Sequence, residues 1–175
     1  MIGGRCVKFG DSVNTDLIMP GRYLVSIDPA ELAGHVFEPL GPEVQARVRA
    51  SKVVVAGRNF GCGSAREQAA SGLAGAGITA VVATSFARVF FRNAINTGLP
   101  AITQPEAAQA AEEGDDVLVD MAAGTVTVRS AAGGDRSFPF PRYPDSLLRI
   151  LDAGGLIPYV AGQIKARPAQ PGGPR

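Results

Sequence analysis

The sequence predicts an α/β fold, a mixed sheet with a parallel βαβ centre and flanking helices. Two apolar stretches, residues 52–56 and 78–83, are separated by a helical segment, the pattern of a βαβ unit whose strands run parallel. Residues 116–120 and 125–130 flank an Ala-Gly turn and predict an antiparallel hairpin. A chain of 175 residues suits one domain, which we expect to span residues 1–166.

Composition excludes several classes of protein. A net charge of +1 from 17 basic and 16 acidic residues argues against a nucleic-acid binder held mainly by phosphate contacts. Two distant cysteines, Cys6 and Cys62, predict neither a disulfide framework nor a zinc site, and cannot supply the four thiolates of a cubane cluster. Since the start lacks a signal-type apolar run and no stretch resembles a membrane span, we expect a cytoplasmic protein.

The N-terminal third is expected to be rich in loops and short helices. Asp28 should cap a helix, with Pro29 in its first turn and Glu31 closing a capping box. The other elements expected here are a strand at 4–9, a polar loop at 10–16, a loop or short 3₁₀ segment at 17–24, and a short helix after Pro42.

The remaining two thirds alternate helices and strands. Phe86, Val89, Phe90 and Ala94 should form the buried face of a helix that ends at Gly98. The other elements expected are a glycine-rich turn at 57–63, helices at 64–76, 86–97, 105–113 and 144–153, a strand at 99–103, and a disordered Pro- and Gly-rich tail at 167–175.

The glycine-rich segment 57–67 follows a strand and precedes a helix, so it carries the candidate chemistry. A dinucleotide fingerprint is disfavoured because Arg66 occupies the third glycine position and no acidic residue lies between Glu67 and Glu106 to bind a ribose. A P-loop is excluded because the sequence has no Gly-Lys-Ser/Thr.

Two interpretations of Ser64 are left open by the residues themselves. In the first, Ser64 and Glu67 form a capping box, although an arginine in the first turn suits the helix dipole poorly. In the second, the helix N-terminus binds an anion, Arg66 clamps a carboxylate and Ser64 is a base in a positive field. Residues 57–98 carry four arginines and one glutamate, which suits a small anionic substrate.

Three blocks of sequence resemble one known family. Residues 59–67 (NFGCGSARE), 85–100 (SFARVFFRNAINTGLP) and 10–24 (GDSVNTDLIMPGRYL) are similar to the signatures of aconitase-family small subunits and swivel domains, in the family's order. The resemblance implies a swivelling β/β/α domain that works beside an iron–sulfur large subunit. The C-terminal third fits by length and pattern only.

The resemblance also implies roles for individual residues. Ser64 would remove a carbon-bound proton, and Arg66 would bind a substrate carboxylate. Thr15 would border the substrate, and Asp16 would position a polar group or a histidine of the partner. The implied reaction removes water and adds it back at the neighbouring carbon. A 4Fe-4S cluster on the large subunit would act as the Lewis acid, with no metal or other cofactor on this chain.

Substrate contacts are implied at Tyr23, Leu24, Val25, Gly63 and Ala65. An apolar loop at 23–26 favours a branched 2-hydroxy dicarboxylate, as in the isopropylmalate isomerases of leucine biosynthesis, although these residues can equally be core. Homoaconitase-type and dimethylmalate-type dehydratases are alternatives, as is a non-catalytic anion-binding module or a purely structural subunit.

Several positions depart from the family pattern or stand apart from its site. The usual Ser-Ser-Arg-Glu-His run is Ser-Ala-Arg-Glu-Gln here, which removes a hydroxyl at Ala65 and leaves Gln68 able to hydrogen-bond. Arg88 and Arg92 lie one helical turn apart, and we expect one to support the site or the subunit interface. His35 and Cys62 are expected to be structural, and Arg22 is not assigned a catalytic role.

Overall fold

One seven-stranded sheet organises the chain, in the order β4-β3-β2-β1-β5-β6-β7. The computed structural model describes residues 1–130 and 133–166, so the tail predicted at 167–175 lies outside the described residues. The strands are β1 (Ile2–Lys8), β2 (Val53–Ala56), β3 (Ala80–Ala83), β4 (Ala101–Thr103), β5 (Asp116–Asp120), β6 (Thr125–Arg129) and β7 (Asp135–Pro139).

The sheet is mixed, as predicted. β1, β2, β3 and β4 run parallel because a helical connection returns the chain to the same edge each time. β5, β6 and β7 form an antiparallel meander, and β5 joins it to β1. β1 therefore belongs to both halves: Ile2–Arg5 pair antiparallel with β5, and Cys6–Lys8 pair parallel with β2.

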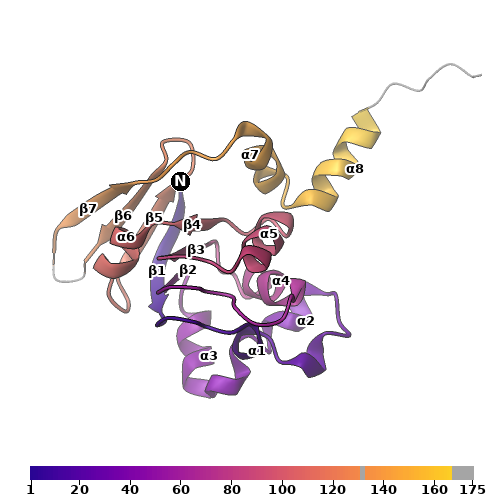
Figure 1. The fold of residues 1–175 in the computed structure, drawn as a ribbon, viewed down its shortest axis with the longest axis horizontal. Helices are drawn as coiled ribbons and strands as arrows, with labels where there is room; N and C mark the ends of the chain where they lie inside the picture. Colours follow the sequence, from indigo (N-terminus) through magenta and orange to yellow (C-terminus); the bar gives the residue numbers. More distant parts are fainter. Residues whose placement is uncertain (131–132, 167–175) are drawn as a thin grey trace, which may run out of the picture.

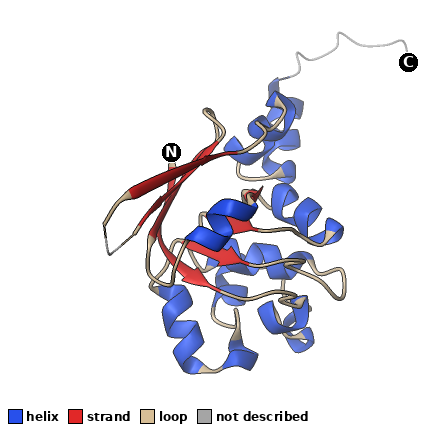
Figure 2. Cartoon of the chain, turned by 60° about the vertical axis from the view of Figure 1, so that its left-hand side comes forward, coloured by secondary structure: helices blue, strands red, loops and turns tan. Residues whose placement is uncertain are grey.

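Both faces of the parallel half are buried, which explains its uninterrupted apolar strands. On one face, Val54, Ala56 and Val81 pack against the helices α1 to α5. On the other face, Val53 and Val55 meet α6 and the curled antiparallel strands, which fold back over the sheet (Figure 2).

Helices α1 to α5 gather on one side of the parallel strands, α6 lies on the other side, and α8 projects beyond them (Figure 1). No helix in the described ranges is long and apolar enough to cross a membrane. The helices are α1 (Thr15–Ile18), α2 (Pro29–Ala33), α3 (Pro42–Arg49), α4 (Glu67–Gly75), α5 (Arg88–Asn96), α6 (Pro105–Ala110), α7 (Asp145–Asp152) and α8 (Leu156–Ala166), with 3₁₀ turns η1 (Gly21–Tyr23) and η2 (Glu38–Leu40).

Several details differ from the sequence prediction, such as helix α1 within the predicted loops and the shorter helices α4, α5 and α6. β7 was not predicted, because its sequence is mostly polar and exposed. α7 is not the final helix, since α8 follows the Gly154-Gly155 break. Val89 points outward on α5, where Phe90, Ala94 and Ile95 are the buried residues. Asp28 does cap α2, but Glu31 closes no capping box and accepts a hydrogen bond from the Ser26 hydroxyl instead.

Candidate functional site

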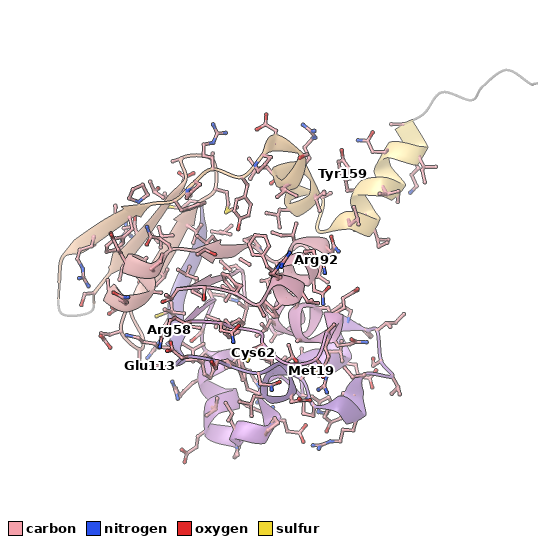
Figure 3. The ribbon with its side chains drawn as sticks, viewed as in Figure 1. Met19, Arg58, Cys62, Arg92, Glu113 and Tyr159 are labelled. Carbon is pink, nitrogen blue, oxygen red and sulfur yellow. The ribbon has the colours of Figure 1, made fainter. Side chains whose placement is uncertain are left out.

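The loops that follow β1 and β2 meet at the carboxyl edge of the parallel strands, where ligands bind in open α/β sheets. Three backbone hydrogen bonds join them: Ser12 N to Arg58 O at 2.7 Å, Gly61 N to Val13 O at 2.8 Å, and Thr15 N to Cys62 O at 2.8 Å. Figure 3 shows Cys62 in this layer, between Arg58 and Met19 in the view. These hydrogen bonds thereby join two of the sequence blocks that resemble the family, residues 10–24 and 59–67, into one unit.

Two glycines permit this close approach. Gly61 has φ +76°, and a Cβ placed on it would lie 2.2 Å from the Phe90 ring. Gly63 has φ +91°, and its Cβ would lie 2.4 Å from Asn14 Oδ1. Since a residue with a side chain would have to push these neighbours aside, glycine is needed for contact as well as for conformation.

Ser64 lies exposed on the loop, three residues before α4. The helix begins at Glu67, and its N-cap residue is Arg66, whose side chain makes no capping hydrogen bond. The capping-box interpretation of Ser64 and Glu67 is therefore wrong. Within the described part of the chain the Ser64 hydroxyl has no hydrogen-bond partner, so it is available to a ligand.

Thr15 holds the Ser64 backbone from beneath. Its side chain is buried, with the residue 1% exposed, and its hydroxyl donates a 2.8 Å hydrogen bond to the Ser64 carbonyl. The neighbouring Asn14 caps α1 by accepting a hydrogen bond from the Asp16 backbone amide at 2.8 Å. Asn14 was not singled out by the sequence analysis, although an asparagine before a short helix is a typical N-cap signal.

Arg66 joins the two loops through its guanidinium. It forms an ion pair with Asp16 and donates a 2.9 Å hydrogen bond to the Met19 carbonyl. The Arg66 side chain is 13% exposed and that of Asp16 is 54% exposed, so the carboxylate lies outermost. The structure thus brings together Ser64, Arg66, Thr15 and Asp16, four of the residues singled out by the sequence, with Gly63 and Ala65 beside them.

The loop that carries Tyr23, Leu24 and Val25 lies next to this group. Gln68 Nε2 donates a 3.1 Å hydrogen bond to the Leu24 carbonyl, so the glutamine keeps a hydrogen-bonding role at this position. Leu24 packs against the main core, whereas Val25 is 93% exposed. Of these apolar side chains, Val25 is the one open to an incoming ligand or protein.

Tyr23 is held in a small polar cluster. Its ring stacks on His35 with centroids 3.6 Å apart, and the Arg22 guanidinium carbon lies 4.8 Å from the centroid of the Tyr23 ring. Hydrogen bonds from Tyr23 and His35 lower the pKa of Glu38, which also pairs with Arg22. His35 supports the loop through its contacts with Tyr23 and Glu38.

The described residues offer no group of three or more His, Cys, Asp and Glu side chains that could hold a metal ion. Both cysteines are free thiols. Cys6 is buried, its thiol donates a 3.1 Å hydrogen bond to the Glu112 carbonyl, and burial raises its pKa to about 11. Cys62 lies in the site layer and donates a 3.4 Å hydrogen bond to the Ser12 carbonyl.

Comparison with known proteins identifies relatives of this chain. Residues 10–107 match the aconitase C-terminal domain. The 3-isopropylmalate dehydratase small subunit of Moorella thermoacetica is 46% identical over 165 residues, covering 94% of this chain and 98% of the relative. The methanogen homoaconitase small subunit of Methanothermobacter thermautotrophicus is 48% identical over 157 residues, covering 90% of this chain and 89% of the relative.

A solved structure agrees with the sequence relatives. The crystal structure of 3-isopropylmalate dehydratase from Methanocaldococcus jannaschii superposes with a TM-score of 0.81 at 39% identity, over 94% of this chain and 95% of that one. The chain therefore belongs to the aconitase C-terminal domain family.

Proposed function

We propose that this chain is the small subunit of a hydro-lyase that converts 2-isopropylmalate to 3-isopropylmalate by dehydration and rehydration, a step of leucine biosynthesis. The observation that carries the proposal is the exposed Ser64 hydroxyl, unpartnered among the described residues, two residues from the Arg66–Asp16 pair at the carboxyl edge of the parallel strands. The names of the relatives favour this reaction, because most of those compared are 3-isopropylmalate dehydratase small subunits.

Ser64 would take the carbon-bound proton of the substrate. The base would be the Ser64 alkoxide, which becomes the neutral hydroxyl when it accepts the proton, and the positive charge of Arg66 two residues away would stabilise that alkoxide. Because the hydroxyl is exposed and makes no hydrogen bond within the described residues, no existing contact has to break before it acts. Thr15 would then act by holding the Ser64 carbonyl from below, since its hydroxyl is committed to that contact.

Arg66 would bind a substrate carboxylate. A guanidinium can bind a carboxylate through two parallel hydrogen bonds, and one of its nitrogens already donates to the Met19 carbonyl. In the free chain the outer side of Arg66 pairs with Asp16, so a substrate carboxylate has to share that pairing or displace it. Asp16 would in turn position a polar group of the substrate or of the large subunit.

The substrate's alkyl group would lie against the loop at Val25, which presents an apolar side chain and no cation. A second carboxylate in that place would have no partner from Leu24 or Val25, which favours a branched alkyl chain over a longer tricarboxylate. Gly63 and Ala65 flank Ser64, and their small size would leave room for the carbon chain of the substrate.

The partner would be an iron–sulfur large subunit, in a heterodimer or heterotetramer, and the enzyme would work in the cytoplasm. This chain's two cysteines do not fit the four-thiolate set of a 4Fe-4S cluster, and we propose that the cluster resides on the large subunit. There it would supply Lewis-acid polarisation of the leaving hydroxyl.

The test is anaerobic co-expression of this chain with its large subunit, followed by turnover assays with 2-isopropylmalate and homocitrate. We expect 2-isopropylmalate turnover, and a fall of about 10²- to 10⁴-fold in kcat for Ser64→Ala at unchanged assembly. Undiminished turnover in Ser64→Ala would show that Ser64 is not the base. Turnover of homocitrate alone would show that homocitrate, and not 2-isopropylmalate, is the substrate. Ligand binding by the free chain without turnover would indicate an anion-binding module.

A further inference from the structure

A second feature of the carboxyl edge takes no part in the proposed chemistry. Beside the Ser64 loop, past the ends of β3 and β4, lies an open hollow of about 710 Å³. Its lining combines two guanidinium groups, two hydroxyls and apolar side chains, among them Arg88, Arg92, Ser85, Thr103, Phe91 and Val89.

The hollow is structurally continuous with the Ser64 loop. Asn59 N donates a 2.8 Å hydrogen bond to the Ser85 hydroxyl, and Phe60 N donates to the Ser85 carbonyl at 3.0 Å. The Phe60 ring also packs edge-on against Phe86, with centroids 6.1 Å apart. A protein that covers Ser64 from outside therefore meets this hollow on the same edge of the sheet.

Arg88 and Arg92 lack the acidic partners that the other arginines of this segment have. Arg58 pairs with Asp11 and Arg66 pairs with Asp16, whereas neither Arg88 nor Arg92 forms an ion pair within residues 1–130 and 133–166. Both are exposed on α5, four residues apart and so on one face of the helix (Figure 3 labels Arg92).

This placement is unfavourable for the free chain. Like charges one turn apart on a helix repel, and a cation at the helix start opposes the macrodipole. Arg88 is the first residue of α5, and the first turn has no acidic side chain to offset it. Val89, an apolar residue 36% exposed, lies between the two arginines in sequence and lines the same hollow.

We propose that this hollow is the docking site for an acidic segment of the large subunit, one that brings carboxylates to Arg88 and Arg92 and an apolar side chain to Val89 and Phe91. The proposal rests on the proposed function, because it takes the large subunit as the partner. The two arginines favour an acidic occupant by charge complementarity. A protein segment fits better than a small anion because the hollow is open and its lining is partly apolar. The hollow also adjoins the edge of the sheet that the large subunit would cover.

The experiment measures binding and turnover separately. The large subunit is titrated with wild-type chain or with Arg88→Gln/Arg92→Gln, and complex formation is followed by analytical ultracentrifugation while turnover is assayed in parallel. We expect the double substitution to raise the Kd by about 10- to 100-fold, with kcat at saturation unchanged. Added salt should weaken the wild-type complex more than the variant complex.

A matched control removes two positive charges near the amino ends of the parallel strands, at the side of the sheet opposite the hollow. Arg49 at the end of α3 and Lys52 just before β2 are exposed and unpaired within the described residues, so Arg49→Gln/Lys52→Gln changes the net charge equally. We expect this control to bind like wild type. Thermal unfolding of each free chain checks that the variants fold.

Each remaining outcome has a definite meaning. Equal binding by wild type and Arg88→Gln/Arg92→Gln overturns the docking site, whatever the turnover. The proposal is also overturned if both double variants weaken binding alike, because binding would then depend on the net charge of the chain and not on the position of the two arginines. Malonate binding by the free wild-type chain that the substitution abolishes, at unchanged assembly, identifies a small-anion pocket instead. Assembly that depends on the arginines but yields no isopropylmalate turnover supports the docking site and refutes the proposed substrate.

Discussion

The buried hydroxyl of Thr15 donates a 2.8 Å hydrogen bond to the backbone carbonyl of the exposed Ser64. This contact joins the loop after β1 to the loop after β2, 49 residues apart in the sequence. It gives the candidate base a rigid support while leaving its side chain free, which is the arrangement expected of a preorganised site.

The Thr15 contact can be tested by a nearly isosteric change. Thr15→Val keeps the shape of the side chain and removes the donor, so we expect the free energy of unfolding to fall by about 0.5–1.5 kcal/mol. The kcat of the assembled enzyme should fall as well, because Ser64 loses its support. Thr15→Ser keeps the hydroxyl and should retain most activity. Urea denaturation and steady-state assays give both quantities, and an unchanged kcat in Thr15→Val would remove the positioning role.

Stability measurements can show whether Ser64 stabilises the fold as a helix cap does. Ser64→Ala should change the free energy of unfolding by less than about 0.5 kcal/mol, since Ser64 is exposed and α4 begins at Glu67. Asp28 is the matched control, because its carboxylate accepts a hydrogen bond from Ala30 N at 2.9 Å at the start of α2. Asp28→Ala should cost about 1 kcal/mol. Equal losses in urea denaturation for the two variants would mean that Ser64 also caps.

The glycine beside Ser64 should tolerate no side chain. Gly63→Ala places a methyl group 2.4 Å from Asn14 Oδ1 at φ +91°, so the loop must shift. We expect a loss of stability of about 1–3 kcal/mol and loss of turnover. Gly162→Ala is the control: it lies in α8, its Cβ meets nothing within 4 Å, and alanine should stabilise the helix slightly. Thermal unfolding and activity assays compare the two, and a fully active Gly63→Ala enzyme would contradict the tight contact.

The buried Cys6 thiol predicts a specific response to alkaline pH. Its folded pKa of about 11 lies above the unfolded thiol value of about 8.5, because burial disfavours the thiolate. A raised folded pKa contributes stability that is fully present below the unfolded pKa and is lost as pH rises toward the folded pKa. Unfolding free energy should therefore fall between about pH 8.5 and 11.

The contribution of Cys6 is isolated by comparison with Cys6→Ala. Tyr143 also has a pKa raised by burial, so part of the alkaline loss has another origin and persists in the variant. Urea denaturation across this pH range should show a steeper decline for wild type than for Cys6→Ala. Parallel declines would mean that the thiol does not titrate with folding.

Local sequence patterns determined much of this protein. Apolar runs at β2 and β3 separated by α4 predicted the parallel centre, because four consecutive buried residues need cover on both faces. The Ala-Gly turn predicted the β5–β6 hairpin, and Asp28-Pro29 predicted the start of α2. The composition of the glycine-rich loop, with a serine and an arginine after a strand, indicated an anion site and carried the family resemblance.

Tertiary structure decided what local patterns leave open. Ser64 and Glu67 have the spacing of a capping box, yet the hydrogen bonds of residues 61–64 with the segment after β1 hold residues 61–64 in a non-helical conformation, so α4 begins only at Glu67. The polar strand β7 forms because β6 offers it an edge. The packing of distant loops brings Asp16 to Arg66, and it leaves Arg88 and Arg92 without an acidic partner among the described residues. Such pairings depend on contacts across the sheet, which residue order alone does not specify.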